Sequence, residues 1–130
     1  MIFIDTDVAV ALRDNHFETQ DRIAELASKP VISIITRIEL EHGAMREPAL
    51  AELRRRMLDR VLATLQVEDF VTEDITAYGR IVLALGFSRT KTFDRLIAAQ
   101  AMTRRATLIT RNGDDFRSIP GLELDVWPPM

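Results

Sequence analysis

The amino-acid sequence predicts a single α/β domain, residues 1–130, with a mostly parallel central sheet flanked by helices. Short apolar runs bounded by turn residues alternate along the chain with amphipathic helical patterns. In addition, no repeat, linker or low-complexity tract divides the 130 residues. A chain of this length buries roughly two-thirds of its unfolded surface, which suits one domain with one core.

Five segments are predicted as strands. Pro30 precedes the second of them, and two prolines follow the last, so their ends are marked in the sequence. In chain order they are residues 2–4, 31–35, 65–71, 107–110 and 122–127.

Helical patterns fill the gaps between these strands. The clearest has leucine, methionine and valine at helical spacing, with three consecutive arginines mostly on the other face. The predicted helices cover residues 17–27, 49–65, 75–85 and 93–102, and further helices are expected after Asp5 and Thr36.

Composition excludes several classes of protein. The net charge of −3 argues against an overall basic surface for nucleic acid, although arginine, which contacts phosphate in a bidentate manner, supplies fifteen of the 17 basic residues. The absence of cysteine excludes disulfides and thiol chemistry. No apolar run approaches the roughly 18 residues of a membrane span, and the N-terminus lacks a signal-peptide pattern. We therefore expect a cytoplasmic protein without a membrane partner.

Four acidic residues lie just past a predicted strand or in the first turn of a helix. Asp5 follows the first strand, Glu39 follows the second within about a turn, Asp115 follows the fourth, and Asp94 begins the helix FDRLIAAQAM. Parallel α/β sheets bind ligands outside the carboxyl ends of their strands. We therefore expect these carboxylates to share one edge of the sheet.

Each acid also has a purely structural interpretation. Thr36 and Glu39 have the spacing of a capping box, and Asn112 can cap a helix that has Asp115 three residues on. Asp94 could simply favour the positive end of its helix. These interpretations explain the acids one by one but not their convergence.

Basic residues accompany the acids along the chain. They either neutralise an ordinary charged rim or contact phosphate beside a metal site. They are Arg37, Arg89, Lys91, Arg95 and Arg111.

Other catalytic motifs are absent from the sequence. A single E-x-x-H, formed by Glu39 and His42, does not make a di-iron bundle, which needs two such motifs on long helices. The chain also has no nucleophile elbow and no phosphate-binding loop of the G-x-x-x-x-G-K-[ST] type.

Three stretches, FIDTDV, TRIELEHG and FDRLIAAQAMTRRATLITRNGDDF, resemble the PIN-domain ribonucleases, and most closely the VapC-type toxins of bacterial toxin–antitoxin pairs. The resemblance covers nearly the whole chain and implies that Asp5, Glu39, Asp94 and Asp115 are the acidic quartet that binds one or two Mg²⁺ or Mn²⁺ ions. Asp115 is chosen over Asp114 because Phe116 follows it, as in the D-F of the family.

The resemblance also implies polar neighbours for this quartet. Thr6 would lie beside Asp5, while Thr110 and Asn112 would line the pocket. Asp7 stands where the family often has Asn, so it either adds a fifth carboxylate or caps the first helix.

The implied function is that of a Mg²⁺- or Mn²⁺-dependent endoribonuclease toxin that cleaves structured RNA, such as tRNA or rRNA. A metal-activated water would leave a 5′-phosphate and a 3′-hydroxyl. The implied partners are a cognate VapB-like antitoxin and a second copy of the chain in a homodimer. We expect Val10, Leu12 and Leu40 to line the antitoxin's groove.

Two other functions remain open at this stage. A PIN-like scaffold could bind RNA or a partner without cutting it. The D-x-D of FIDTD, with Asp114 and Asp115, could also belong to a haloacid-dehalogenase-like phosphatase, but Ala9 and the short chain argue against that class. A receiver domain is excluded, because a helix occupies the place of its phosphoacceptor strand.

Overall fold

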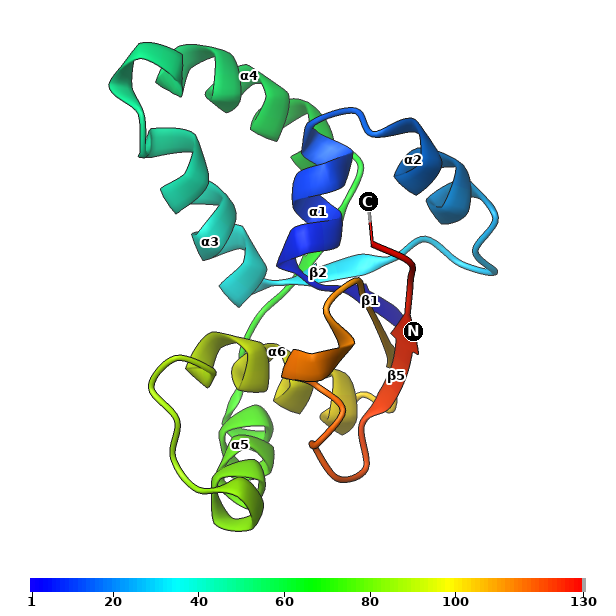
Figure 1. Cartoon of the computed structure of the whole chain (residues 1–130), viewed down its shortest axis with the longest axis vertical. Helices are drawn as coiled ribbons and strands as arrows, with labels where there is room; N and C mark the ends of the chain where they lie inside the picture. The colour runs from blue at the N-terminus through cyan, green and yellow to red at the C-terminus, as the bar shows by residue number, and fades with distance from the viewer. Residues whose placement is uncertain (130) are drawn as a thin grey trace.

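The computed structural model describes residues 1–129 and has a five-stranded sheet at its centre (Figure 1). The spatial order is β3-β2-β1-β4-β5, and every neighbouring pair is parallel, which confirms the predicted fold class. The strands are β1 (Ile2–Ile4), β2 (Val31–Ser33), β3 (Gln66–Glu68), β4 (Thr107–Thr110) and β5 (Glu123–Val126).

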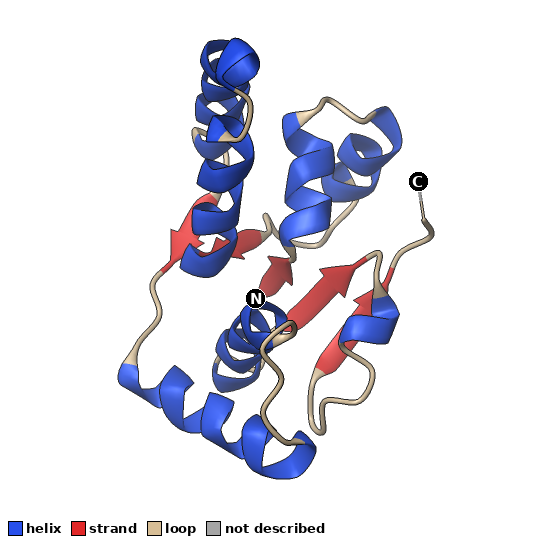
Figure 2. Cartoon of the chain, turned by 60° about the vertical axis from the view of Figure 1, so that its left-hand side comes forward, coloured by secondary structure: helices blue, strands red, loops and turns tan. Residues whose placement is uncertain are grey.

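Helices cover both faces of this sheet (Figures 1 and 2). Four lie on one face: α1 (Thr6–Arg13), α2 (Phe17–Ala24), α3 (Ile34–Met45) and α4 (Ala51–Leu62). Two lie on the other: α5 (Thr72–Leu85) and α6 (Thr92–Thr103). Two short 3₁₀ helices, η1 (Pro48–Leu50) and η2 (Gly113–Asp115), complete the structure. Within residues 1–129, no helix is long and apolar enough to cross a bilayer.

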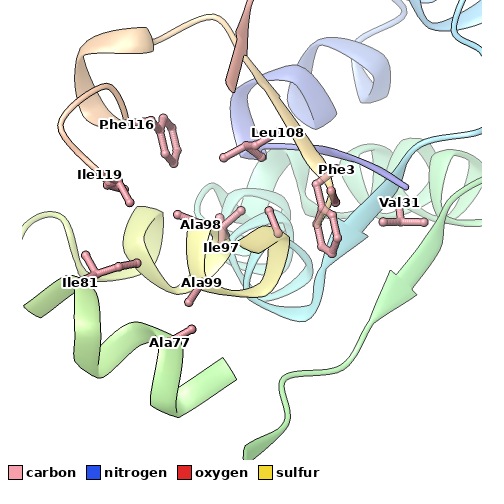
Figure 3. Packing of buried hydrophobic residues seen from close by; sticks show 12 residues of the cluster. Phe3, Val31, Ala77, Ile81, Ile97, Ala98, Ala99, Leu108, Phe116 and Ile119 are labelled. Carbon is pink, nitrogen blue, oxygen red and sulfur yellow. The ribbon is translucent and has the colours of Figure 1, made fainter. Parts of the chain in front are cut away.

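Alternate residues of the strands face the two helical layers, so the core has two parts. Ile4 and Ile109 pack with residues of α1, α3 and α4, whereas Phe3 and Leu108 pack with α5 and α6. Figure 3 shows α6 between the sheet and α5, with Ala99 turned towards α5. The small alanines of α6 let it pack closely against both of its neighbours.

The strand predicted over residues 31–35 was too long at its carboxyl end. The Ser33 hydroxyl accepts a hydrogen bond from the Ile35 N–H at 2.9 Å, and this cap begins α3 at Ile34. The capping box predicted at Thr36 and Glu39 is therefore wrong, because both residues already lie inside the helix.

Three helix boundaries also differ from the prediction. The helix predicted over residues 49–65 is divided into η1, which begins at Pro48, and α4, and the helix predicted over residues 17–27 ends at Ala24. Helix α5 begins at Thr72 and not at residue 75, because Asp74 accepts a hydrogen bond from the Val71 N–H at 2.9 Å and so caps the first turn.

Asp74 also ties α5 to the end of α6. Its buried carboxylate accepts hydrogen bonds from the Thr103 hydroxyl and from Arg104 Nη1 at 2.9 Å. Burial alone would raise the pKa of Asp74, but the hydrogen bonds from Thr103, Val71 and Arg104 outweigh it and lower the pKa. Arg104 also pairs with Glu68 of β3 at 3.7 Å and donates to the Asp69 carbonyl, so the network joins β3, α5 and the end of α6.

Replacing Asp74 with Ala should lower the free energy of unfolding by about 3 kcal/mol, because it leaves the Arg104 guanidinium without its buried partner. Urea denaturation of the purified protein measures the loss. The control is Glu73→Ala, which removes the neighbouring exposed carboxylate and should change stability by less than about 0.5 kcal/mol. Equal losses in the two variants would contradict the structural role of Asp74.

Candidate functional site

The candidate site lies between β1 and β4, where the order in which the chain adds strands to the sheet reverses. From β1 the chain moves outward to β2 and β3, then returns to place β4 on the other side of β1. Neighbouring strands that lead away in opposite directions leave a crevice at their carboxyl ends. Asp5 follows β1 directly, and η2, with Asp115, follows β4.

The structure brings the predicted acids together at this crevice. A hollow of about 370 Å³ is lined by residues that follow β1 and β4 and by the start of α6: Asp5, Thr6, Asp7, Val10, Asp94, Asn112 and Asp115. Glu39 of α3 shares a neighbouring hollow with Asp94. The four predicted acids thus approach one another from four parts of the chain, while their role in metal binding stays a prediction.

Asp5 is almost fully removed from solvent. Its Oδ2 accepts a hydrogen bond from the buried Thr110 hydroxyl at 2.5 Å, and its Oδ1 caps α1 by accepting from the Val8 N–H at 3.4 Å. Burial and the adjacent Asp7 carboxyl nevertheless raise the pKa of Asp5 to about 9. Without a cation, the Asp5 and Asp7 pair therefore retains a proton to higher pH than isolated carboxyls would.

Asp94 is shifted in the same direction by its surroundings. Burial, together with the negative charges of Asp115, Glu39 and Asp7, raises its pKa to about 6, although Lys91 partly offsets them. These charge interactions are the electrostatic consequence of the proximity of the acids, because repulsion between carboxylates strengthens as they approach.

Glu39 accepts a hydrogen bond from one hydroxyl group, which lies against a second hydroxyl group. Thr6 Oγ1 donates to Glu39 Oε1 at 2.6 Å and lies 3.1 Å from Thr36 Oγ1. Thr36 is fully buried, so its side chain supports Thr6 from within the protein. The three-residue spacing of Thr36 and Glu39 predicts a cap, whereas in the structure the Thr36 hydroxyl lies against Thr6.

Asp115 has a similar support from the segment after β4. Asn112 Nδ2 donates to Asp115 Oδ2, while the Asn112 backbone N–H donates to Thr110 Oγ1 at 3.0 Å. Asn112 therefore holds the carboxylate and makes no side-chain cap on η2, contrary to the predicted capping role. Thr110 and Asn112 connect Asp5 to Asp115 through this short segment.

The donor set has the chemistry of a site for a hard divalent cation. All its ligating atoms are oxygens, which Mg²⁺ prefers, and the buried Asp7 Oδ1 has no hydrogen-bond partner. As the side chains stand within residues 1–129, however, no three acidic or histidine residues could hold one ion together. The residues fit the cation by charge and donor type, and Mg²⁺ commonly takes only one or two carboxylates and keeps several waters.

The predicted basic rim is only partly present. Arg95 is buried and donates to the Gly86 carbonyl at 2.7 Å, so its prediction as a rim residue is wrong. Arg111 donates to the Thr19 hydroxyl and the Pro128 carbonyl, which ties the C-terminal segment to α2. Arg37 pairs with Glu41.

Two of the predicted basic residues remain near the acids. Arg89 is exposed and lines a hollow of about 460 Å³ with Glu39 and Asp94, and Lys91 interacts electrostatically with Asp94. On the other side of Glu39, the sequence analysis missed Arg13, Arg46 and Arg54, which line a hollow of about 320 Å³. Arg46 lies two helical turns after Glu39, a spacing that was available as a signal.

Comparisons with known proteins agree with this architecture. Residues 2–122 match the family profile described as "PIN domain". The chain is 30% identical to "Ribonuclease VapC2" of Rickettsia felis, over 95% of this chain and 96% of that protein. It is 28% identical, with the same coverage, to "tRNA(fMet)-specific endonuclease VapC" of Salmonella typhimurium.

Solved structures show the same fold. VapBC2 from Rickettsia felis, bound to a DNA fragment from its promoter, contains a chain with a TM-score of 0.87 and 28% identity, and the match covers 98% of this chain and 99% of that one. DNA-bound VapBC from Salmonella typhimurium gives a TM-score of 0.84 and 27% identity, with 97% of each chain covered.

The raised pKa values make a prediction for the metal-free protein. Because Asp5 and Asp94 bind protons more tightly in the folded chain than in the unfolded chain, stability should fall as pH rises from the ordinary carboxyl range to about 6, and less steeply from there to about 9. Melting in EDTA should thus show a midpoint several degrees lower at alkaline pH than at pH 5.

The Asp94→Asn variant should lose the part of this fall that lies between the ordinary carboxyl pKa and about pH 6, and should keep the part above pH 6 that Asp5 causes. Glu52→Gln, which changes an exposed carboxylate on α4, should retain the wild-type profile. A wild-type melting temperature that rises between pH 5 and alkaline pH would contradict the close approach of the carboxylates.

Proposed function

The chain belongs to the PIN-domain family, and within it to the VapC ribonucleases, and we propose that it is a metal-dependent endoribonuclease that acts as the toxin of a toxin–antitoxin pair. The observation that carries the proposal is the meeting of Asp5, Glu39, Asp94 and Asp115 at one edge of the sheet. The domain is proposed to span the whole chain, because β5 and the buried Trp127 complete the sheet and core beyond residue 122.

The proposed cofactor is Mg²⁺, for which Mn²⁺ can substitute. When bound, the ion lowers the pKa of a water and offsets negative charge on the phosphodiester. Asp5, Asp94 and Asp115, with Glu39, would hold it through carboxylate oxygens. The crowding of these acids supports the assignment, since a divalent cation replaces the protons that their repulsion otherwise retains.

The remaining polar residues position the acids. Thr6 fixes one oxygen of Glu39, Thr110 fixes one oxygen of Asp5, and Asn112 fixes one oxygen of Asp115. Glu39 and Asp115 thus each keep one carboxylate oxygen outside these contacts, while the second oxygen of Asp5 caps α1 through the Val8 N–H. Attack of water on phosphorus with departure of the 3′ oxygen would leave a 5′-phosphate and a 3′-hydroxyl.

The proposed substrate is structured RNA in the cytoplasm, with tRNA ahead of rRNA. Two curated relatives are named as tRNA(fMet)-specific endonucleases, which supports tRNA as the first substrate to test. Exposed Arg89 beside Glu39 and Asp94 supports a contact with the RNA backbone.

The proposed antitoxin is a VapB-like protein that lays an apolar helix on the chain. The expected groove included Leu40, but Leu40 is fully buried and cannot line it. A cleft of about 340 Å³ between α1, α2 and α4 has the required apolar lining, with Leu12, Ile23 and Met57 among its residues. An amphipathic helix binds such a cleft through apolar anchors at helical spacing.

The chain is proposed to form a homodimer. Large apolar side chains are exposed on α5 and just beyond it, at Ile75, Leu83 and Phe87. A second copy that covered them would remove this apolar surface from water.

Purified protein with Mg²⁺ should cut a tRNA transcript at discrete positions, and EDTA should abolish the cuts. Asp5→Asn and Asp94→Asn should reduce cleavage below detection, while Thr6→Val should lower kcat by about 10- to 100-fold through loss of its support for Glu39. Asp59→Asn, an exposed acid on α4, should cut like the wild type. Gel analysis of labelled tRNA and rRNA fragments measures all four.

A melting experiment separates this function from an inert scaffold. Mg²⁺ at a hundredfold excess over its Kd should raise the free energy of unfolding by about 2.7 kcal/mol. A protein that cuts no RNA in the panel and shows no metal-dependent melting shift would contradict the enzyme. Wild-type cutting by the Asp5 and Asp94 variants would contradict the site.

Replacing Met57 with Asp should prevent rescue by the antitoxin while leaving toxicity intact, because a charge in the apolar cleft opposes an apolar helix there. Growth during co-expression of toxin and antitoxin measures the effect. The matched control is Leu53→Asp on the same helix, outside the cleft and already exposed. Full rescue of the Met57 variant would place the antitoxin elsewhere.

A further inference from the structure

Three arginines from three helices surround Gly43 of α3. The Arg54 guanidinium donates to the Gly43 carbonyl at 3.3 Å, and Arg13 Nη1 lies 3.3 Å from the position that a Cβ would occupy on Gly43. Arg46, at the end of α3, lines the same hollow of about 320 Å³. The missing side chain of Gly43 thus helps to keep this hollow open between the three cationic groups.

These arginines are available to an anionic ligand. Arg46 is exposed and has no ion-pair partner within residues 1–129. Arg13 pairs with Asp14 at 3.0 Å and Arg54 with Glu47 at 3.3 Å, and both of these acids are more than half exposed. Ion pairs with solvated carboxylates contribute little, so a phosphate can replace them at small cost.

The hollow adjoins the acidic site directly. Glu39 and Thr6, which hydrogen-bond to each other, both line it, and Thr6 and Val10 also line the hollow that contains Asp5 and Asp94. The backbone phosphates of an RNA strand that reaches this site are repelled by the negative charges of the carboxylates. Cations beside Glu39 would offset that repulsion within about one Debye length.

We propose that Arg13, Arg46 and Arg54 form a binding subsite for a backbone phosphate of the RNA, next to the bond that is cut. This inference rests on the proposed ribonuclease function and adds the location of a substrate contact. Arginine suits the task because its planar fork matches phosphate oxygens in a bidentate manner. Since the contact is to phosphate, it contributes affinity and register but no base specificity.

Two variants test the subsite by different means. Arg46→Gln removes one positive charge without breaking an ion pair, and Gly43→Leu fills the hollow while all three arginines remain. Leucine is also a better helix former than glycine, so α3 should persist in the second variant. Arg56→Gln is the matched control, because it removes one exposed charge from α4 outside the hollow.

Binding is measured by fluorescence anisotropy of a labelled oligouridylate in Mg²⁺ over a series of KCl concentrations. All proteins carry Asp94→Asn for this purpose, so that cleavage does not interfere. Arg46→Gln should weaken binding several-fold and reduce the slope of log K against log salt by about 0.7, the value for one lost contact to a single strand. Gly43→Leu should weaken binding to a similar degree, and Arg56→Gln should match the parent protein.

Cleavage of tRNA by otherwise wild-type proteins gives the second measurement. Arg46→Gln should raise KM several-fold with kcat nearly unchanged, because the phosphate contact is made in both the ground state and the transition state. Unchanged affinity, slope and KM in both variants would overturn the subsite while leaving the nuclease intact.

Two further outcomes would also overturn the subsite. A wild-type protein that neither binds nor cuts RNA would overturn the subsite and the proposed function together. Loss of antitoxin binding by Arg46→Gln with normal RNA binding would assign the hollow to the antitoxin. Melting curves identify a variant that fails to fold. In that case the RNA affinity of the other variant tests the subsite.

Discussion

Repulsion among carboxylates at the end of β1 is the constraint on which the site depends. Asp5 is buried against Asp7, and Asp94 lies in the field of Asp115, Glu39 and Asp7, so the metal-free fold retains protons that ordinary carboxyls would release. The two packed cores on either side of the sheet hold these acids together despite that repulsion. Functional sites commonly contain groups whose mutual repulsion lowers stability until a ligand binds.

Much of the fold could be predicted because its determinants are local. Apolar strand runs and helical periodicity identified the sheet, and the ends of β1 and β4 located Asp5 and Asp115. The errors came from side chains whose partners are distant or ambiguous in sequence. Ser33 and Thr36 can both cap a helix, and only packing decided that Ser33 caps α3 while Thr36 supports Thr6.

The basic residues show a second limit of sequence reasoning. Arg95 and Arg111 lie beside site residues in the chain, yet their side chains turn to the Gly86 carbonyl and to Thr19. Arg13 and Arg54 lie far from Glu39 in sequence and meet beside it only because α1, α3 and α4 pack together. Proximity along the chain is therefore a poor guide for long, flexible side chains.

The wholly parallel sheet also determines when during synthesis the site can exist. Thr110 must donate to Asp5 across 105 residues of sequence, and β4 must lie beside β1 before Asp115 can approach the other acids. Every strand pairing in the sheet joins segments separated by a crossover, so none can form as a local hairpin. A chain still on the ribosome without its last quarter therefore has no assembled acidic centre, and the cell that makes this protein is not exposed to its chemistry until translation is nearly complete.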